Sequence, residues 1–198
     1  LHSTQDGEMH YFVFAQDGHS AQYHIDAEGK SHLVAEFKLA TTAEGCVVDD
    51  EYGALYVSEE KKAIWRFSTK DIMSAPKSVI NVTLLGSLRA DAEGLTLYTK
   101  PDGSGYLIAS SQGNSTYLVF DRKNNQLIGR FKINENTYDT VTGTDGIFGT
   151  SRSLGEHYPA GAFIAHDHQN HDNGFLMNQN FKLIDWRTIE EQLTNNER

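Results

Sequence analysis

The sequence predicts an all-β fold, and within that class a β-propeller, from three observations. Short runs of β-branched and aromatic residues dominate the chain, and Gly, Pro and Asp turn signals separate them. A helical pattern is nearly absent before residue 183, and only the C-terminal tail, 183–198, has a sequence compatible with a helix. An acid–glycine pair recurs at Glu44, Glu93 and Asp145, at spacings of 49 and 52 residues. A unit of about 50 residues with several strands is typical of a propeller blade, whereas a sandwich has no reason to repeat its turns at that period.

The expected strands follow the same order in each unit. An apolar strand, preceded by a turn, comes after each acid–glycine pair: Ala54–Ser58, Tyr106–Ser110 and Ala162–Ala165. A second strand follows in the first two units: Ala63–Phe67 and Tyr117–Phe120. Tyr11–Phe14 and Tyr23–Ile25 match these two strands, so we expect an earlier unit whose leading half is missing. Residues 1–198 therefore form a single, partial propeller domain of about four blades.

The acidic balance of the chain limits its partners. The net charge is −10 at pH 7, and such a field repels nucleic acid and anionic membranes, so neither is an expected partner. A polyanionic small molecule would be repelled too, unless bound cations reverse the local charge. Cys46 is the single cysteine, which excludes an intrachain disulfide and a cysteine-rich zinc site. We expect no membrane span, which needs roughly 20 apolar residues, and no signal peptide in this chain.

Equivalent positions in successive blades converge near the propeller axis, so the acid–glycine pairs place Glu44, Glu93 and Asp145 in one ring. A second, mostly acidic set is in register at the end of the next strand: Asp17, Glu60, Gln112 and Asp167. Carboxylates held together repel one another unless a cation lies between them, and hard oxygen donors without thiols favour calcium. One acid–glycine pair alone is usually only a turn, but registered pairs favour a metal site. We expect Asp49–Glu51, in contrast, to be an ordinary solvated turn.

Three histidines lie close together near the end of the chain: His166, His168 and His171. His166 and His168 alternate, so they project from one side of a strand at a spacing compatible with zinc or nickel. A loop of scattered surface histidines remains the alternative. Neither a Gly-x-Ser-x-Gly elbow nor a phosphate-binding P-loop occurs, so nothing supports a covalent serine mechanism.

Several blocks of the sequence closely resemble the β-propeller (alkaline) phytases. The matching blocks are Thr42–Gly45, Asp49–Tyr56, Glu59-Glu60, Ala63–Phe67, Asp91–Tyr98, Gly105–Ser115 and Asn178–Lys182 with Trp186. They cover most of the chain in the family's order. The resemblance implies a six-bladed propeller, of which this chain is the C-terminal portion, beginning within the third blade. It also implies several calcium ions, at the axial cleft and at the periphery, and a secreted or periplasmic location.

The resemblance further implies roles for individual residues. The expected catalytic residues, whose carboxylates hold the active-site calcium ions, are Glu44, Glu60, Asp91 and Glu93. The expected substrate-binding residues are Gln112 and Arg66. The residues that match the region of the structural calcium sites are Asp145, Asp167 and Asn170.

The implied activity is the calcium-dependent hydrolysis of phosphate monoesters of phytate (myo-inositol hexakisphosphate) by a metal-activated water. The expected partners are phytate or calcium-phytate, and the missing blades or a second phytase domain. Some positions depart from the family: Gln16 stands where the family has a cleft lysine, Gly143 and Phe148 replace acids, and His166 and His168 replace Gln and Gly. The alternative is therefore a degenerate, non-catalytic phytase-like domain that binds calcium or a phosphorylated ligand.

Overall fold

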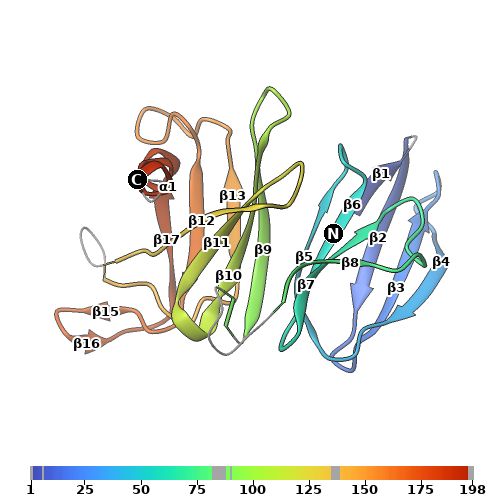
Figure 1. The fold of residues 1–198 in the computed structure, drawn as a ribbon, viewed down its shortest axis with the longest axis horizontal. Coiled ribbons are helices and arrows are strands. Elements are labelled where there is room, and N and C mark those ends of the chain that lie inside the picture. Colours follow the sequence, from blue (N-terminus) through green and yellow to red (C-terminus); the bar gives the residue numbers. More distant parts are fainter. Residues whose placement is uncertain (1, 6, 82–87, 90, 135–138, 196–198) are drawn as a thin grey trace.

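The computed structural model describes residues 2–5, 7–81, 88–89, 91–134 and 139–195, which form successive antiparallel sheets along the chain (Figure 1). In each of the first three sheets, strands that are consecutive in sequence are also neighbours in the sheet. The first blade contains β1 (His2–Gln5), β2 (Glu8–Phe14), β3 (His19–Ile25) and β4 (Ser31–Lys38). The second contains β5 (Ala43–Asp49), β6 (Ala54–Glu59), β7 (Ala63–Ser68) and β8 (Lys77–Asn81).

The third and fourth blades continue the same plan. The third contains β9 (Ala92–Thr99), β10 (Gly105–Ser111), the 3-10 turn η1 (Gln112–Asn114), β11 (Thr116–Asp121) and β12 (Leu127–Phe131). The fourth contains β13 (Ile147–Thr150), β14 (Ala162–Asp167) and β17 (Asn180–Asp185), in that order. A hairpin of β15 (His171–Asp172) and β16 (Phe175–Leu176) is inserted before β17, and α1 (Trp186–Asn195) follows it.

The first strands of the blades pack side by side: β1 contacts β5, β5 contacts β9, and β9 contacts β13. An apolar core fills each space between neighbouring blades. Because the second blade has a neighbour on either side, β6 is buried on both faces, with Leu55 and Val57 in one core and Tyr56 in the next. These features confirm the prediction of a β-propeller. Within this chain the blades do not close into a ring (Figure 1).

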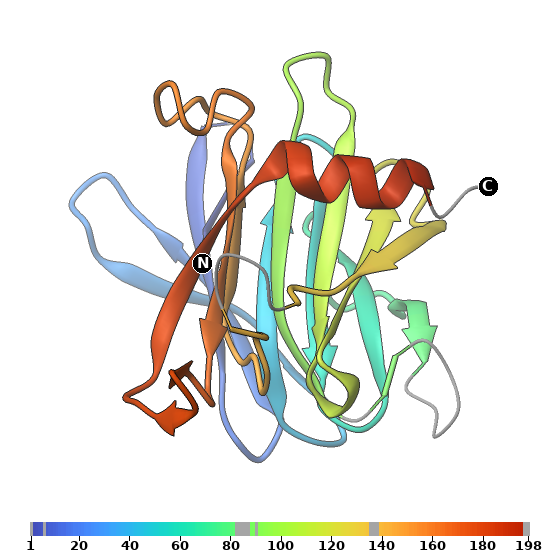
Figure 2. The ribbon, with the colours of Figure 1, turned by 90° about the vertical axis from the view of Figure 1, so that its left-hand side faces the viewer.

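The C-terminal helix α1 lies across the third and fourth blades, where it contacts β12 and β17 (Figure 2). Trp186, Ile189 and Leu193 recur at helical spacing and are buried in the core between these blades. The Asp185 carboxylate accepts a hydrogen bond from the Arg187 N–H and so caps the helix. The expected helical tail thus starts at residue 186, because 183–185 complete β17. No helix in the described ranges is long and apolar enough to span a membrane.

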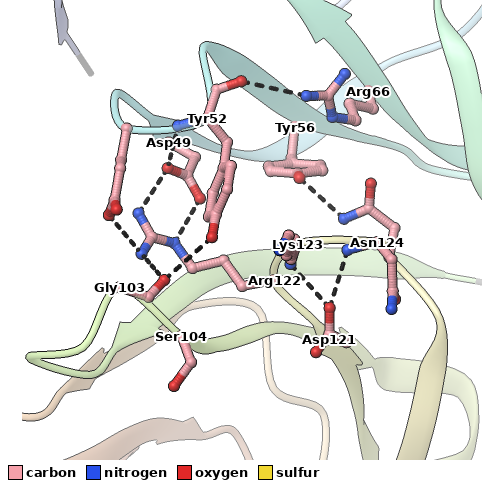
Figure 3. A network of polar contacts seen from close by, with 12 residues as sticks. Asp49, Tyr52, Tyr56, Arg66, Gly103, Ser104, Asp121, Arg122, Lys123 and Asn124 are labelled. Carbon is pink, nitrogen blue, oxygen red and sulfur yellow. Dashed lines mark hydrogen bonds and ion pairs between the residues drawn. The ribbon is translucent and has the colours of Figure 1, made fainter.

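A buried arginine joins the second and third blades at the ends of β5 and β11 (Figure 3). The Arg122 guanidinium pairs bidentately with Asp49, at 2.6 and 2.7 Å, and its Nη1 donates to Glu51 at 2.9 Å. Its Cζ also lies 4.9 Å from the centroid of the Tyr52 ring. Asp49 is only 1% exposed. The prediction that Asp49–Glu51 is an ordinary solvated turn is therefore wrong, because Asp49 anchors the neighbouring blade.

The first blade also differs from expectation. Its leading half is not missing, because β1 (His2–Gln5) pairs with β2 from His2↔Tyr11 to Gln5↔Glu8. The first blade therefore has four strands, like the second and third.

Candidate functional site

The acid–glycine pairs bring three carboxylates together on adjoining blades: Glu44 on β5, Glu93 on β9, and Asp145 just before β13. The backbones approach so closely that a Cβ atom on Gly45 would lie 2.5 Å from the Glu93 carbonyl oxygen. A Cβ atom on Gly94 would lie 2.5 Å from the Asp145 carbonyl oxygen, to which the Gly94 N–H donates at 2.8 Å. Only glycine permits this approach. The repeated glycines therefore hold the three acids near one another.

Two further acids reach the same end of the blades, one through a backbone hydrogen bond between blades and the other through one within the third blade. The Ala92 N–H donates to the Glu60 carbonyl at 3.1 Å, so the end of β6 is tied to the start of β9. The Gln112 N–H donates to the Asp91 carbonyl at 3.0 Å, which ties the end of β10 to the residue before β9. Glu60 also forms an ion pair with Lys61 at 2.9 Å, so one cation lies at the rim of the group.

Glu59, the acid next to Glu60, has a different role. It is 2% exposed, and its Oε1 accepts hydrogen bonds from the backbone N–H groups of Ala40 and Thr41, both at 2.7 Å. Its Oε2 accepts one from Trp65 Nε1 at 2.7 Å. Glu59 therefore fixes the connection between the first two blades and leaves Glu60 to face the carboxylate cluster, which we define as Glu44, Glu60, Asp91, Glu93 and Asp145.

Glu44 and Glu93 lie close enough to the other acids of the carboxylate cluster that ionisation of these two groups is disfavoured. Burial, followed by repulsion from Glu44, Asp145, Asp91 and Glu60, raises the pKa of Glu93 from 4.5 to about 7. Burial, followed by repulsion from Glu60, Asp91 and Asp145, also raises the pKa of Glu44, although Lys61 opposes the shift. A cation at this point would relieve the repulsion, because it favours the ionised carboxylates.

The donor chemistry of the cluster fits a hard divalent cation such as calcium, since every candidate ligand is a carboxylate oxygen. The cluster is not a preformed cage, however. Across the described ranges, no three His, Cys, Asp or Glu side chains are grouped so that they could hold a metal ion. Ion binding at this site would therefore require the carboxylates to move toward a common centre.

A chain of polar contacts extends from the carboxylate cluster across the fourth blade. Gln112 Nε2 donates to Asp145 Oδ1 at 2.6 Å, and Asp145 Oδ2 lies 3.5 Å from His166 Nδ1. The amide of Gln179 then joins two histidines: its Oε1 is 3.2 Å from His166 Nε2, and its Nε2 is 2.7 Å from His168 Nδ1. The structure thus places Gln112 and His166 at the edge of the cluster.

The predicted structural calcium site near Asp167 and Asn170 is occupied by a lysine. Lys182 Nζ lies 2.6 Å from Asp139 Oδ1 and 3.3 Å from the buried Asp167 Oδ2, and it donates to Asn170 Oδ1 at 2.7 Å. A calcium ion at this point would have to displace the ammonium group. Asp167 and Asn170 therefore do not fit the predicted structural calcium site while Lys182 remains there. His171 lies on the exposed strand β15, where its backbone N–H donates to Asp139. In the described part of the chain it does not join His166 and His168 in a group that could hold a metal ion.

Arg66 lies away from the carboxylate cluster. It is on β7, and its Nη2 donates to the Tyr52 carbonyl at 3.3 Å, beside the turn that joins β5 and β6 (Figure 3). Glu44 is at the other end of β5. The position of Arg66 does not support the prediction that it binds substrate with Gln112.

The sequence analysis did not identify Lys61 as part of the site. Its position directly after Glu60 in the sequence could have indicated a cation beside the acids.

Comparisons with known proteins agree with this architecture. A family model described as Phytase matches residues 1–198. The 3-phytase of Bacillus subtilis (strain 168) is 41% identical over 198 residues, in a match that covers 97% of this chain and 52% of that protein. The chain thus spans about half the length of this curated relative.

Two solved structures are similar in fold alone. Hydrazine synthase of Kuenenia stuttgartiensis has a TM-score of 0.57 and 16% identity, covering 94% of this chain and 46% of that chain. A chain of the mitotic checkpoint complex has a TM-score of 0.55 and 9% identity, covering 84% and 44%. The sequence matches, in contrast, extend over nearly the whole chain, and they show that the chain belongs to the phytase family.

Proposed function

We propose that this chain is part of a calcium-dependent phytase that hydrolyses phosphate monoesters of phytate. The observation that carries the proposal is the convergence of five carboxylates, which raises the pKa of Glu93 to about 7 and creates a site that favours a cation. The relative that is 41% identical bears the name 3-phytase, which supports phytate as the substrate class.

In this proposal Glu44, Glu60, Asp91 and Glu93 hold the ions. Bound calcium would supply positive charge for the substrate phosphates and lower the pKa of a water molecule that attacks phosphorus. Gln112 lies at the rim, where its side-chain amide holds Asp145 in place and can donate to a phosphate oxygen. No serine or cysteine nucleophile is required by this chemistry.

We also propose that the missing blades, or a second phytase domain, pack against the first blade. Met9, Val13 and Leu33 are 45%, 48% and 53% exposed. They lie on one face of this sheet, because Met9 and Val13 alternate on β2 and Leu33 pairs with Tyr23, the cross-strand partner of Tyr11. Contact with another blade would bury these apolar side chains. We also propose a secreted or periplasmic location, and the resemblance to the phytases is what supports it.

The test is phosphate release from calcium-phytate by this chain, compared with a chain extended by the missing blades and with both proteins in chelator. We expect a low rate from this chain, a higher rate from the extended protein, and loss of both rates in chelator. Glu44→Gln with Glu93→Gln should abolish release, whereas Glu28→Gln, an exposed acid on the first blade, should not. Release that persists in chelator would refute calcium dependence. Calcium binding without release from either protein would favour the non-catalytic alternative.

A further inference from the structure

A cationic groove of about 790 Å³ runs along β12, the outer strand of the third blade. Its cationic residues are Arg89, Arg130 and Lys132, which come from the connection before β9 and from β12 with the residue after it. No acid is among the described residues that line the groove. The whole chain has 27 acids against 17 Lys and Arg residues, so the described lining of this groove is opposite in charge to the chain as a whole.

The neutral lining of the groove also suits an anion. Asn114, Asn134 and Gln192 also line the groove, and their side chains carry amide donors. Asn114 Oδ1 accepts a hydrogen bond from the Thr116 hydroxyl at 2.6 Å, and this bond does not use the NH₂ group of Asn114. Guanidinium groups bind phosphate oxygens in pairs, and a lysine ammonium adds a point charge. The donor set therefore matches the oxygens of phosphate groups, and a groove of this volume is in the range of small-molecule sites.

The groove adjoins the carboxylate cluster but is chemically opposite to it. Turn η1 carries Gln112, which donates to Asp145 of the cluster, and Asn114, which lines the groove. Arg89 is two residues from Asp91. Without a metal ion the cluster repels anions, whereas the groove attracts them.

We propose that this groove is a separate anion site, which binds a polyphosphorylated small molecule directly, without a metal ion. This assignment rests on the cationic residues and hydrogen-bond donors of the groove, and it does not depend on the proposed hydrolysis. An inositol polyphosphate fits the class, because its several phosphates could engage cations from both segments that line the groove.

The experiment measures binding of phytate and of pyrophosphate to this chain by calorimetry in chelator, so that the carboxylate cluster holds no metal. We expect saturable binding that weakens as salt rises. The variant with Arg89→Gln, Arg130→Gln and Lys132→Gln should bind at least about tenfold more weakly, since even one charge-assisted hydrogen bond contributes about that factor. The matched control, Lys30→Gln with Lys70→Gln and Lys77→Gln, removes three exposed cations elsewhere and should bind like the parent chain.

The outcomes separate the groove from a general charge effect and from the proposed catalysis. Absence of phytate and pyrophosphate binding in chelator, or an equal loss in both triple variants, would overturn the proposal. Circular dichroism and a retained melting transition would show that the groove variant is folded. Binding in chelator by this chain, with no phosphate release in calcium from either this chain or the extended protein, would refute the proposed hydrolysis and leave the groove assignment intact.

Discussion

Replacement of Glu93 by Gln should stabilise the calcium-free chain at alkaline pH. Burial and neighbouring acids raise the pKa of Glu93 from 4.5 to about 7, so the folded state keeps a proton that the unfolded state loses. The free energy of unfolding therefore falls as pH rises through this window. The shift corresponds to at most about 3 kcal/mol. Solvent screening around the rest of the cluster reduces the expected gain for Glu93→Gln to about 1–2 kcal/mol at about pH 8.5.

The assay is urea unfolding in chelator, followed by tryptophan fluorescence, at about pH 4 and about pH 8.5. Near pH 4 the Glu93 carboxyl is mostly protonated in both states, so Glu93→Gln and the parent chain should be nearly equal in stability. Glu28→Gln removes the same charge from an exposed turn and controls for net charge. The argument from charge repulsion would be refuted if Glu93→Gln were no more stable than the parent chain at about pH 8.5. It would also be refuted if the difference in free energy of unfolding were the same at both pH values.

Four other changes test the fold and the site. Calcium should raise the melting temperature and chelator should lower it by mass action, and superimposable melting curves would contradict this. Arg122→Ala leaves Asp49 buried without its partner and should cost about 3–5 kcal/mol in urea unfolding, whereas Arg187→Ala, at an exposed ion pair, should cost much less. Lys182→Met should lower the melting temperature and make it more responsive to calcium, because the ammonium no longer occupies the acidic pocket; an unchanged calcium response would oppose this. Gly45→Ala should destabilise by more than about 1 kcal/mol through its clash with a neighbouring carbonyl, whereas Gly146→Ala, with open space around it, should stay within about 0.5 kcal/mol.

The middle strands of the blades were predictable from the sequence because packing on both of their faces requires a continuous run of apolar residues. The predicted strands Ala54–Ser58 and Tyr117–Phe120 correspond to β6 and β11, which are apolar because blades cover both of their faces. The outer strands β4 and β8 were not predicted. They are mostly exposed, so neither an apolar run nor a clear alternation distinguishes them from loops.

Some residues of the candidate site could likewise be predicted from the sequence, and others could not. The acids Glu44, Glu93 and Asp145 could be grouped from sequence because the repeat carries their register. The pairing of Asp49 with Arg122 could not, because these residues are 73 positions apart and meet only through the packing of two blades. The placement of Lys182 among acids likewise depends on how β17 lies beside β14.

The acid–glycine pairs connect the stability of the fold to its chemistry. Glycine lets β5 approach β9, and β9 approach the residues before β13, more closely than any other residue would allow. That approach permits the hydrogen bond between Gly94 and the Asp145 carbonyl, and it forces the preceding acids into one another's fields. Separation of the blades would relieve the repulsion but would expose the apolar cores between them. Packing therefore holds the carboxylates in an unfavourable arrangement that a bound cation would stabilise, so the cation affinity that we propose would follow from how the blades are joined.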